Sequence, residues 1–198
     1  MATLINSGYQ DDPRIEKGFH WLLSMQQNEG GWATPLITHT LDRQTQYRLT
    51  SEYAEPVEPD RTKPFSFNCT GMVLRAFAAH PSYRFSTEAR TAANLLKSRF
   101  FQPNNYTSYH DASYWVRFEY PFWWNNLVST LDSLSLMGNS KDDQQISLAL
   151  TWLVDHQEES GLWKVTYAKE QVKESQKGNE MKLWVSLAIC RVFHRFYQ

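Results

Sequence analysis

Cysteine is scarce in this sequence, as are other features that would assign the chain to a particular class of protein. The 198 residues contain two cysteines, too few for a disulfide framework and typical of a reducing compartment. Lysine and arginine together number 20 against 21 acidic residues, which gives a net charge of −1. Since no basic stripe is present to attract phosphates, we do not expect nucleic acid as a partner.

Long apolar runs are also missing. No stretch of the sequence approaches the roughly 20 apolar residues that a membrane-spanning helix needs. Residues 1–12 lack the basic and then apolar pattern of a signal peptide. We therefore expect a protein without a membrane span, located in the cytoplasm.

Aromatic residues, by contrast, are abundant: 8 Trp, 10 Tyr and 11 Phe make up 15% of the chain. So many rings indicate either large side chains packed between helices or a cavity lined by rings. A hydrophobic fraction of 41% with 21% charged residues is typical of a globular protein. A chain of this length can bury a sizeable core, so we expect residues 1–198 to form a single domain.

A segment near the N-terminus is repeated near the C-terminus, in one register and without a gap. Each copy predicts an amphipathic helix that begins at an aspartate cap and ends at a glycine. Both copies finish on the pattern Gln-x-x-x-Gly-x-Trp. The matched pairs are Asp11 and Asp142, Trp21 and Trp152, Gln26 and Gln157, Gly30 and Gly161, and Trp32 and Trp163.

Between these copies lies a weaker third one, which begins at Ser86-Thr87-Glu88 and lacks the Gln-Gly-Trp ending. Apolar residues at helical spacing predict a further helix after each copy, over residues 68–80, 121–136 and 180–196. This alternation predicts an all-α fold of about three helical hairpins. Within each hairpin the connection is long, and these long loops should lie on one face, where function is usually found. They cover residues 33–66, 102–119 and 164–178.

The repeated ending resembles the QW motif of the prenyltransferase and squalene-cyclase superfamily of α/α toroids. The resemblance implies outer and inner helices that alternate around a cavity. Since a complete toroid of that superfamily has about six hairpins, this chain would form an incomplete, α/α-toroid-like half-ring. The expected partner is therefore a second copy or another chain that closes the half-ring.

The motif itself has a mechanical interpretation. A glutamine amide can satisfy backbone groups at a helix end, a glycine permits the sharp turn, and a tryptophan buries its bulk there. We interpret these residues as a structural clamp without chemistry. They are Gln26, Gly30, Trp32, Gln157, Gly161 and Trp163.

Residues 109–124 contain the densest group of aromatic and polar side chains. Their rings could line an apolar pocket or stabilise a cation, or they could wedge between helices. On the first alternative, the candidate ligand-binding residues are Tyr109, Tyr114, Trp115, Arg117, Tyr120, Trp123 and Trp124.

The candidates for acid–base chemistry are His110, Glu119 and Asp132. Asp132 follows Asn125 and Ser129 at spacings i, i+4 and i+7, which places a polar strip on one helix face. That strip could face a wet cavity or the solvent.

Two chemistries of the superfamily lack their motifs here. The sequence contains neither the Asp-x-Asp-Asp motif with which squalene–hopene-type cyclases protonate an alkene nor the Asp-x-Cys zinc pair of protein prenyltransferases. Cys190 and His194 share a helix face but have no third ligand, so we expect no metal and no cofactor.

We therefore expect a cyclase-like domain with an aromatic-lined cleft that binds a lipid-like or isoprenoid ligand, or a protein partner, without catalysis of its own. The alternative is an enzyme. It would be related to terpene cyclases or prenyltransferases, or to the α/α-toroid polysaccharide lyases and hydrolases, whose residue types occur in residues 109–119.

Overall fold

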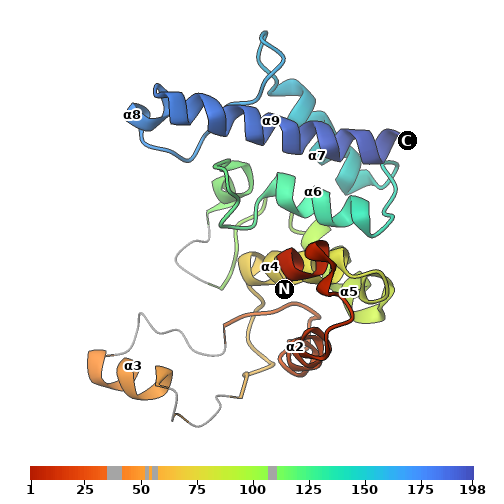
Figure 1. Cartoon of the computed structure of the whole chain (residues 1–198), viewed down its shortest axis with the longest axis vertical. Helices are drawn as coiled ribbons and strands as arrows, with labels where there is room; N and C mark the ends of the chain where they lie inside the picture. The colour runs from red at the N-terminus through yellow and green to blue at the C-terminus, as the bar shows by residue number, and fades with distance from the viewer. Residues whose placement is uncertain (35–41, 52–53, 55–57, 107–110) are drawn as a thin grey trace.

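The computed structural model describes residues 1–34, 42–51, 54, 58–106 and 111–198 (Figure 1). Every regular element within these ranges is a helix and none is a strand. The all-α prediction is therefore confirmed. None of the helices in the described ranges is long and apolar enough to cross a membrane.

The three copies of the repeat form the outer helices α2 (Pro13–Ser24), α5 (Thr87–Lys97) and α7 (Gln144–Asp155). Each begins at a side chain that accepts a hydrogen bond from a backbone N–H of the first turn, as N-caps do. These caps are Asp12, Ser86 and Asp143. The weak third copy is thus a helix with its own cap, although it lacks the clamp.

The inner helices are α4 (Phe67–Ala79), α6 (Leu127–Leu136) and α9 (Gln176–Tyr197). Helix α4 packs on α6, and α6 packs on α9. Figure 1 shows their ribbons one above another, with α2 and α9 at opposite ends of the long axis. Their buried leucines and phenylalanines form the centre of the core, as expected for a partial α/α toroid.

Two inner helices begin at other positions than the sequence predicts. Helix α6 starts at Leu127 rather than at residue 121, because Asn126 is extended and forms a capping box with Ser129. Helix α9 starts at Gln176 rather than at residue 180, because Ser175 accepts a hydrogen bond from the backbone N–H of Gly178. The second connection therefore extends further along the chain than predicted, and the third ends earlier.

Short helices without a clear apolar period were not predicted. Residues 1–9 lie against α4, where Ile5 is only 3% exposed. The others lie within connections or between hairpins. These elements are α1 (Ala2–Leu4), η1 (Ile5–Tyr9), α3 (Arg43–Thr50), η3 (Tyr83–Phe85), η4 (Ala112–Val116) and α8 (Glu170–Lys173).

The two copies of the Gln-x-x-x-Gly-x-Trp motif form the same hydrogen bonds. Gln26 Nε2 donates to the Gly30 carbonyl at 2.8 Å, and Gln157 Nε2 donates to the Gly161 carbonyl at 2.8 Å. The indole N–H of each tryptophan donates at 2.7 Å to a carbonyl in the last turn of its outer helix. Both glycines have positive φ angles, 92° and 79°, so the turn favours glycine. The motif therefore closes the end of an outer helix by hydrogen bonds that its own residues supply.

Candidate aromatic binding site

The segment that enters α6 is fixed to the third hairpin by backbone hydrogen bonds. The Thr166 hydroxyl donates to the Val116 carbonyl at 2.7 Å and accepts from the Phe118 N–H at 2.7 Å. The N–H groups of Thr166 and Tyr167 both donate to the Phe118 carbonyl. Residues 116–118 and 166–167 therefore lie side by side at the N-terminal ends of α6 and α9.

Helix α4 holds the same segment from the other side. The guanidinium of Arg75 donates to the carbonyls of Phe122 and Trp124 at 2.8 and 2.9 Å, and Asn68 accepts from the N–H of Asn125 at 2.7 Å. Burial lowers the pKa of Arg75. These bonds occupy carbonyls that a longer α6 would use, so Arg75 positions the aromatic rings of residues 122–124.

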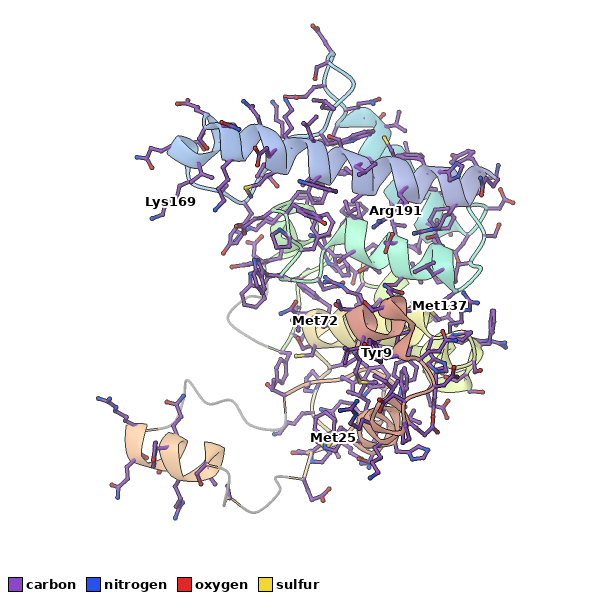
Figure 2. The ribbon with its side chains drawn as sticks, in the orientation of Figure 1. Tyr9, Met25, Met72, Met137, Lys169 and Arg191 are labelled. Carbon is purple, nitrogen blue, oxygen red and sulfur yellow. The ribbon has the colours of Figure 1, made fainter. Side chains whose placement is uncertain are left out.

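A broad, open hollow of about 690 Å³ lies where these segments meet. Most of its wall is aromatic or apolar, with two lysines and one carboxylate as charged groups. Figure 2 labels one of the lysines, Lys169, at the end of the molecule where α8 meets α9. We call this hollow the aromatic cleft; it is lined by Glu119, Tyr120, Pro121, Trp123, Thr166, Tyr167, Ala168, Lys169, Val172, Lys177 and Met181.

A second and much smaller hollow, of about 10 Å³, shares Glu119, Trp123 and Tyr167 with the aromatic cleft. The Arg117 guanidinium lies over the Tyr114 ring at 3.8 Å and near the Tyr167 ring at 5.4 Å. The attraction between a cation and the face of an aromatic ring offsets part of the free energy that it costs to remove the cation from water. Arg117 lines the smaller hollow but not the aromatic cleft. The smaller hollow is lined by Tyr114, Arg117, Glu119, Phe122, Trp123, Trp124, Asn126 and Tyr167.

The inner helix α9 supports the aromatic cleft through one ring pair. Tyr120 stacks on Trp184 with ring centroids 5.3 Å apart and an interplanar angle of 11°. Trp123 projects further, since 69% of its surface is exposed. The cleft therefore has one ring fixed by stacking and one ring open to a ligand.

Most of the predicted ligand-binding residues lie around these two hollows, but Trp115 does not. Its ring is fully buried, stacks on Phe67 at 4.9 Å and meets Phe100 edge-on at 5.2 Å. Its indole N–H donates to the Gln102 carbonyl. Trp115 therefore wedges between helices, which is the second of the two alternatives, and does not line a pocket. Tyr109 and His110 lie outside the described residues.

Asp132 lines neither hollow. Its carboxylate accepts from Arg195 at 2.7 Å and lies 3.4 Å from the Arg191 guanidinium, so it joins α6 to α9. The other members of the predicted polar strip, Asn125 and Ser129, are 1% and 5% exposed. Ser129 donates to the amide oxygen of Asn125, and both side chains lie within the core, where they face neither a wet cavity nor the solvent. The amide nitrogen of Asn125 has no hydrogen-bond partner among the described residues.

Within the described ranges, no three side chains of histidine, cysteine, aspartate or glutamate are grouped so that they could hold a metal ion. Cys190 is exposed, and His194 lies beside the amide of Gln198 at 2.7 Å. The absence of a metal or cofactor in the protein remains a prediction.

Several residues of the aromatic cleft were not identified from the sequence. Tyr167 and Lys169 lie in the long connection of the third hairpin, and Lys177 lies in the first turn of α9. All three fall within residues 164–178, the connection predicted to lie on the same face as residues 102–119. Two loops on one face are the signal that could have paired them. Arg75 was also missed, and the available signal was a single charged residue in an otherwise uncharged helix.

Comparison with known proteins gives one finding. No curated protein and no solved structure matches the chain. A family model, however, matches residues 3–190, which is nearly the whole sequence, and it describes the squalene-hopene cyclase C-terminal domain. Its match agrees with the alternating outer and inner helices and with the two clamps described above. The chain belongs to the squalene-hopene cyclase C-terminal domain family.

Proposed function

We propose that the aromatic cleft binds an isoprenoid-like apolar ligand. The observation that carries this proposal is the gathering of Tyr120, Trp123 and Tyr167 around one open hollow of about 690 Å³. Ligand pockets usually have volumes of about 300–1,000 Å³ and mostly apolar walls with a few polar groups. A branched hydrocarbon chain would bury its surface against these rings, and the entropy of released water would favour binding.

The domain binds without catalysing a reaction on its own in this proposal. The sequence has no Asp-x-Asp-Asp segment that could protonate an alkene. Of the predicted acids in the described part of the chain, Asp132 is held by two arginines and lies outside the cleft. The cytoplasmic location and the single domain over residues 1–198 are parts of the same proposal.

Binding can be tested with farnesol and squalene as probes and stearate as a straight-chain comparison. Tryptophan fluorescence should change on titration, and native mass spectrometry should detect the bound probe. Replacing Trp123 by Ala should weaken farnesol binding about tenfold, which corresponds to roughly 1.4 kcal/mol. The matched control is Tyr47→Ala, because Tyr47 is 79% exposed on α3 and does not line the cleft.

Equal binding by the wild type and Trp123→Ala would place the ligand elsewhere. No binding of either isoprenoid would contradict the proposed ligand class. Tighter binding of stearate than of farnesol would instead favour a general lipid site.

A catalytic role is the second candidate, and Glu119 is the observation that favours it. Its carboxyl group lines the aromatic cleft together with Trp123, and an acid beside aromatic rings can donate a proton to a substrate. Incubation with squalene followed by product analysis tests this alternative. A product formed by the wild type and lost in Glu119→Gln, with farnesol binding unchanged, would replace binding by catalysis as the function.

We also propose that a partner completes the half-ring, either a second copy or another chain. Exposed apolar side chains on the inner helix α9 support this, because Leu183, Trp184 and Leu187 are 57%, 50% and 54% exposed. Exposed apolar patches of this kind commonly mark interaction surfaces.

A further inference from the structure

The three inner helices can be aligned by equivalent hydrogen bonds. The Trp32 N–H donates to the Thr70 hydroxyl at 2.8 Å, and the Trp163 N–H donates to the Ser186 hydroxyl at 2.9 Å. Thr70 in α4 is therefore equivalent to Ser186 in α9. Thr70 and Thr130 of α6 are equivalent too, because each stands at the same distance along the chain from the N-cap of its helix, Ser66 or Asn126.

This alignment identifies the side of each inner helix that faces the next hairpin. In α4, Phe67 stacks on Trp115 of the second hairpin, and a Cβ on Gly71 would lie 2.0 Å from Asn125. The equivalent side of α6 is fully buried. In α9 the same positions are exposed. The aligned sets are Phe67, Gly71 and Leu74 in α4, Leu127, Leu131 and Leu134 in α6, and Leu183, Leu187 and Cys190 in α9.

The opposite end of the array shows the complementary difference. Trp152 in the third hairpin packs near Phe101 and Phe118 of the hairpin before it, with ring centroids 6.0 and 6.1 Å apart. Its counterpart in the first hairpin, Trp21, is 60% exposed. Both ends therefore present apolar positions that a neighbouring hairpin covers elsewhere in the same chain.

We infer that two copies of this chain associate head to tail, with the Leu183–Leu187 side of α9 against the first hairpin of the other copy around Trp21. The inference rests on the proposed completion of the half-ring and names its occupant and its surfaces. Within the chain, the same side of α4 and of α6 packs against the next hairpin, and we call such a contact a seam. The first hairpin of a second copy would offer α9 the surface that the second and third hairpins offer to α4 and α6. Helices α2 and α9 lie far apart along the long axis (Figure 1). Each copy can therefore contact the other at both ends, which a ring of two copies requires. Two copies would form a closed ring with two identical seams.

A pairing of α9 with α9 of a second copy explains less. It would cover Leu183 and Leu187 in both copies but would leave Trp21 exposed in both. The head-to-tail arrangement covers both ends of each chain, and it requires both ends to be intact.

The oligomeric state of three variants tests the inference. Light scattering of the eluting wild type should give twice the mass of one chain, and dilution over about a hundredfold range should dissociate it by mass action. Leu187→Arg and Trp21→Arg should each give the mass of one chain at all concentrations. The matched control is Leu148→Arg, which should stay dimeric. Leu148 is 53% exposed on α7, and its counterpart Thr91 on α5 faces Gly30 of the preceding hairpin, so Leu148 lies on the side that faces its own chain rather than the second copy.

Mixing Leu187→Arg with Trp21→Arg should restore a dimer of one copy of each, because one seam between them is then unaltered. Circular dichroism melts establish that the variants are folded, and Leu187→Gln and Trp21→Gln replace them if an arginine variant is not. A wild type with the mass of one chain at every concentration would overturn the inference. So would a dimer that Trp21→Arg leaves intact, since that result indicates pairing through α9 alone.

Farnesol titration of the same samples separates this result from the proposed ligand. A chain that binds farnesol but stays monomeric contradicts only the head-to-tail ring. A dimer that binds no isoprenoid contradicts only the ligand class.

Discussion

The first and third hairpins end their outer helices with the same motif, yet the two clamps lie in different surroundings. Around Trp32, the Phe77 ring lies 5.5 Å away, and Phe77 also meets Phe19 edge-on at 4.9 Å. Around Trp163, the Phe193 ring lies 6.4 Å away. Both tryptophans are buried, but the first clamp belongs to a larger cluster of rings than the third.

The glycines differ in the same direction. A Cβ on Gly30 would lie 2.3 Å from Cγ2 of Thr91, whereas a Cβ on Gly161 would meet only the flexible amide of Gln157, 4.0 Å away. Both residues have positive φ angles, so both turns favour glycine. The motif therefore determines the local hydrogen bonds, while the position in the array determines how much the clamp contributes to stability.

The largest expected effect comes from removing the tryptophans. Both are buried, so Trp32→Ala and Trp163→Ala should each lower the free energy of unfolding by about 3–5 kcal/mol. The loss should be greater for Trp32, because its removal opens the ring cluster with Phe77 and Phe19. Urea denaturation measures the difference, and equal losses would show that the clamp contributes independently of its neighbours.

The glycine pair gives the clearest contrast. Gly161→Ala should cost about 1–2 kcal/mol, from backbone strain at a positive φ alone. Gly30→Ala should cost about 1–3 kcal/mol more, because its Cβ also overpacks against Thr91. The double variant Gly30→Ala with Thr91→Ser removes the opposing methyl group and should recover most of that additional loss. A Gly30→Ala protein as stable as Gly161→Ala would contradict the contact with α5.

The caps of the two outer helices provide a smaller contrast that depends on pH. Burial alone would raise the pKa of Asp143, but hydrogen bonds from Lys97 and from the Ile146 N–H outweigh it and lower the pKa below its usual range. Asp143 Oδ2 lies 2.7 Å from Nζ of Lys97, which is only 9% exposed. Asn caps a helix about as well as Asp does, so Asp143→Asn mainly removes the charge opposite Lys97 and should cost about 1–2 kcal/mol at neutral pH.

Because the folded-state pKa of Asp143 lies below its unfolded value, this stabilisation is complete above about pH 4 and is lost as pH falls through the folded-state pKa. Asp143→Asn should flatten that part of the stability profile. Asp12 is the comparison: hydrogen bonds from the Arg14 side chain and backbone lower its pKa to about 2. Its pair with Arg14 is exposed to solvent, so salt should weaken the effect of Asp12→Asn more than that of Asp143→Asn.

Much of the fold could be predicted from the sequence because its signals are local. Apolar spacing and caps identify α2, α5 and α7, and the repeated motif identifies the hairpins. The predicted start of α6 was wrong for two reasons: the local capping box of Asn126 with Ser129 was overlooked, and the segment before it is held by a distant residue. Arg75 of α4 binds the carbonyls of Phe122 and Trp124, and no feature of residues 121–126 alone shows that bond.

The candidate site was harder to predict for the same reason. Tyr114, Arg117 and Trp123 do gather at a hollow, but Tyr167 reaches it from another hairpin through backbone bonds to Phe118. Composition also does not separate Trp115, which is buried in the core, from Trp123, which is 69% exposed. Which of two neighbouring rings faces the solvent is decided by packing between hairpins rather than by their spacing in the chain.

The glutamines should show the smallest contrast and the most direct one, since they make identical hydrogen bonds of 2.8 Å. Gln26 is partly buried, so Gln26→Ala leaves the Gly30 carbonyl less able to bind water and should cost about 1–1.5 kcal/mol. Gln157 is exposed, so water can replace its amide, and Gln157→Ala should cost about 0.5 kcal/mol. Thermal melts of both variants, with Gln102→Ala as an exposed glutamine outside the motif, measure these costs. A larger loss for Gln157→Ala would contradict this reasoning. It would show that the third clamp contributes more to stability than the first, although fewer rings surround it.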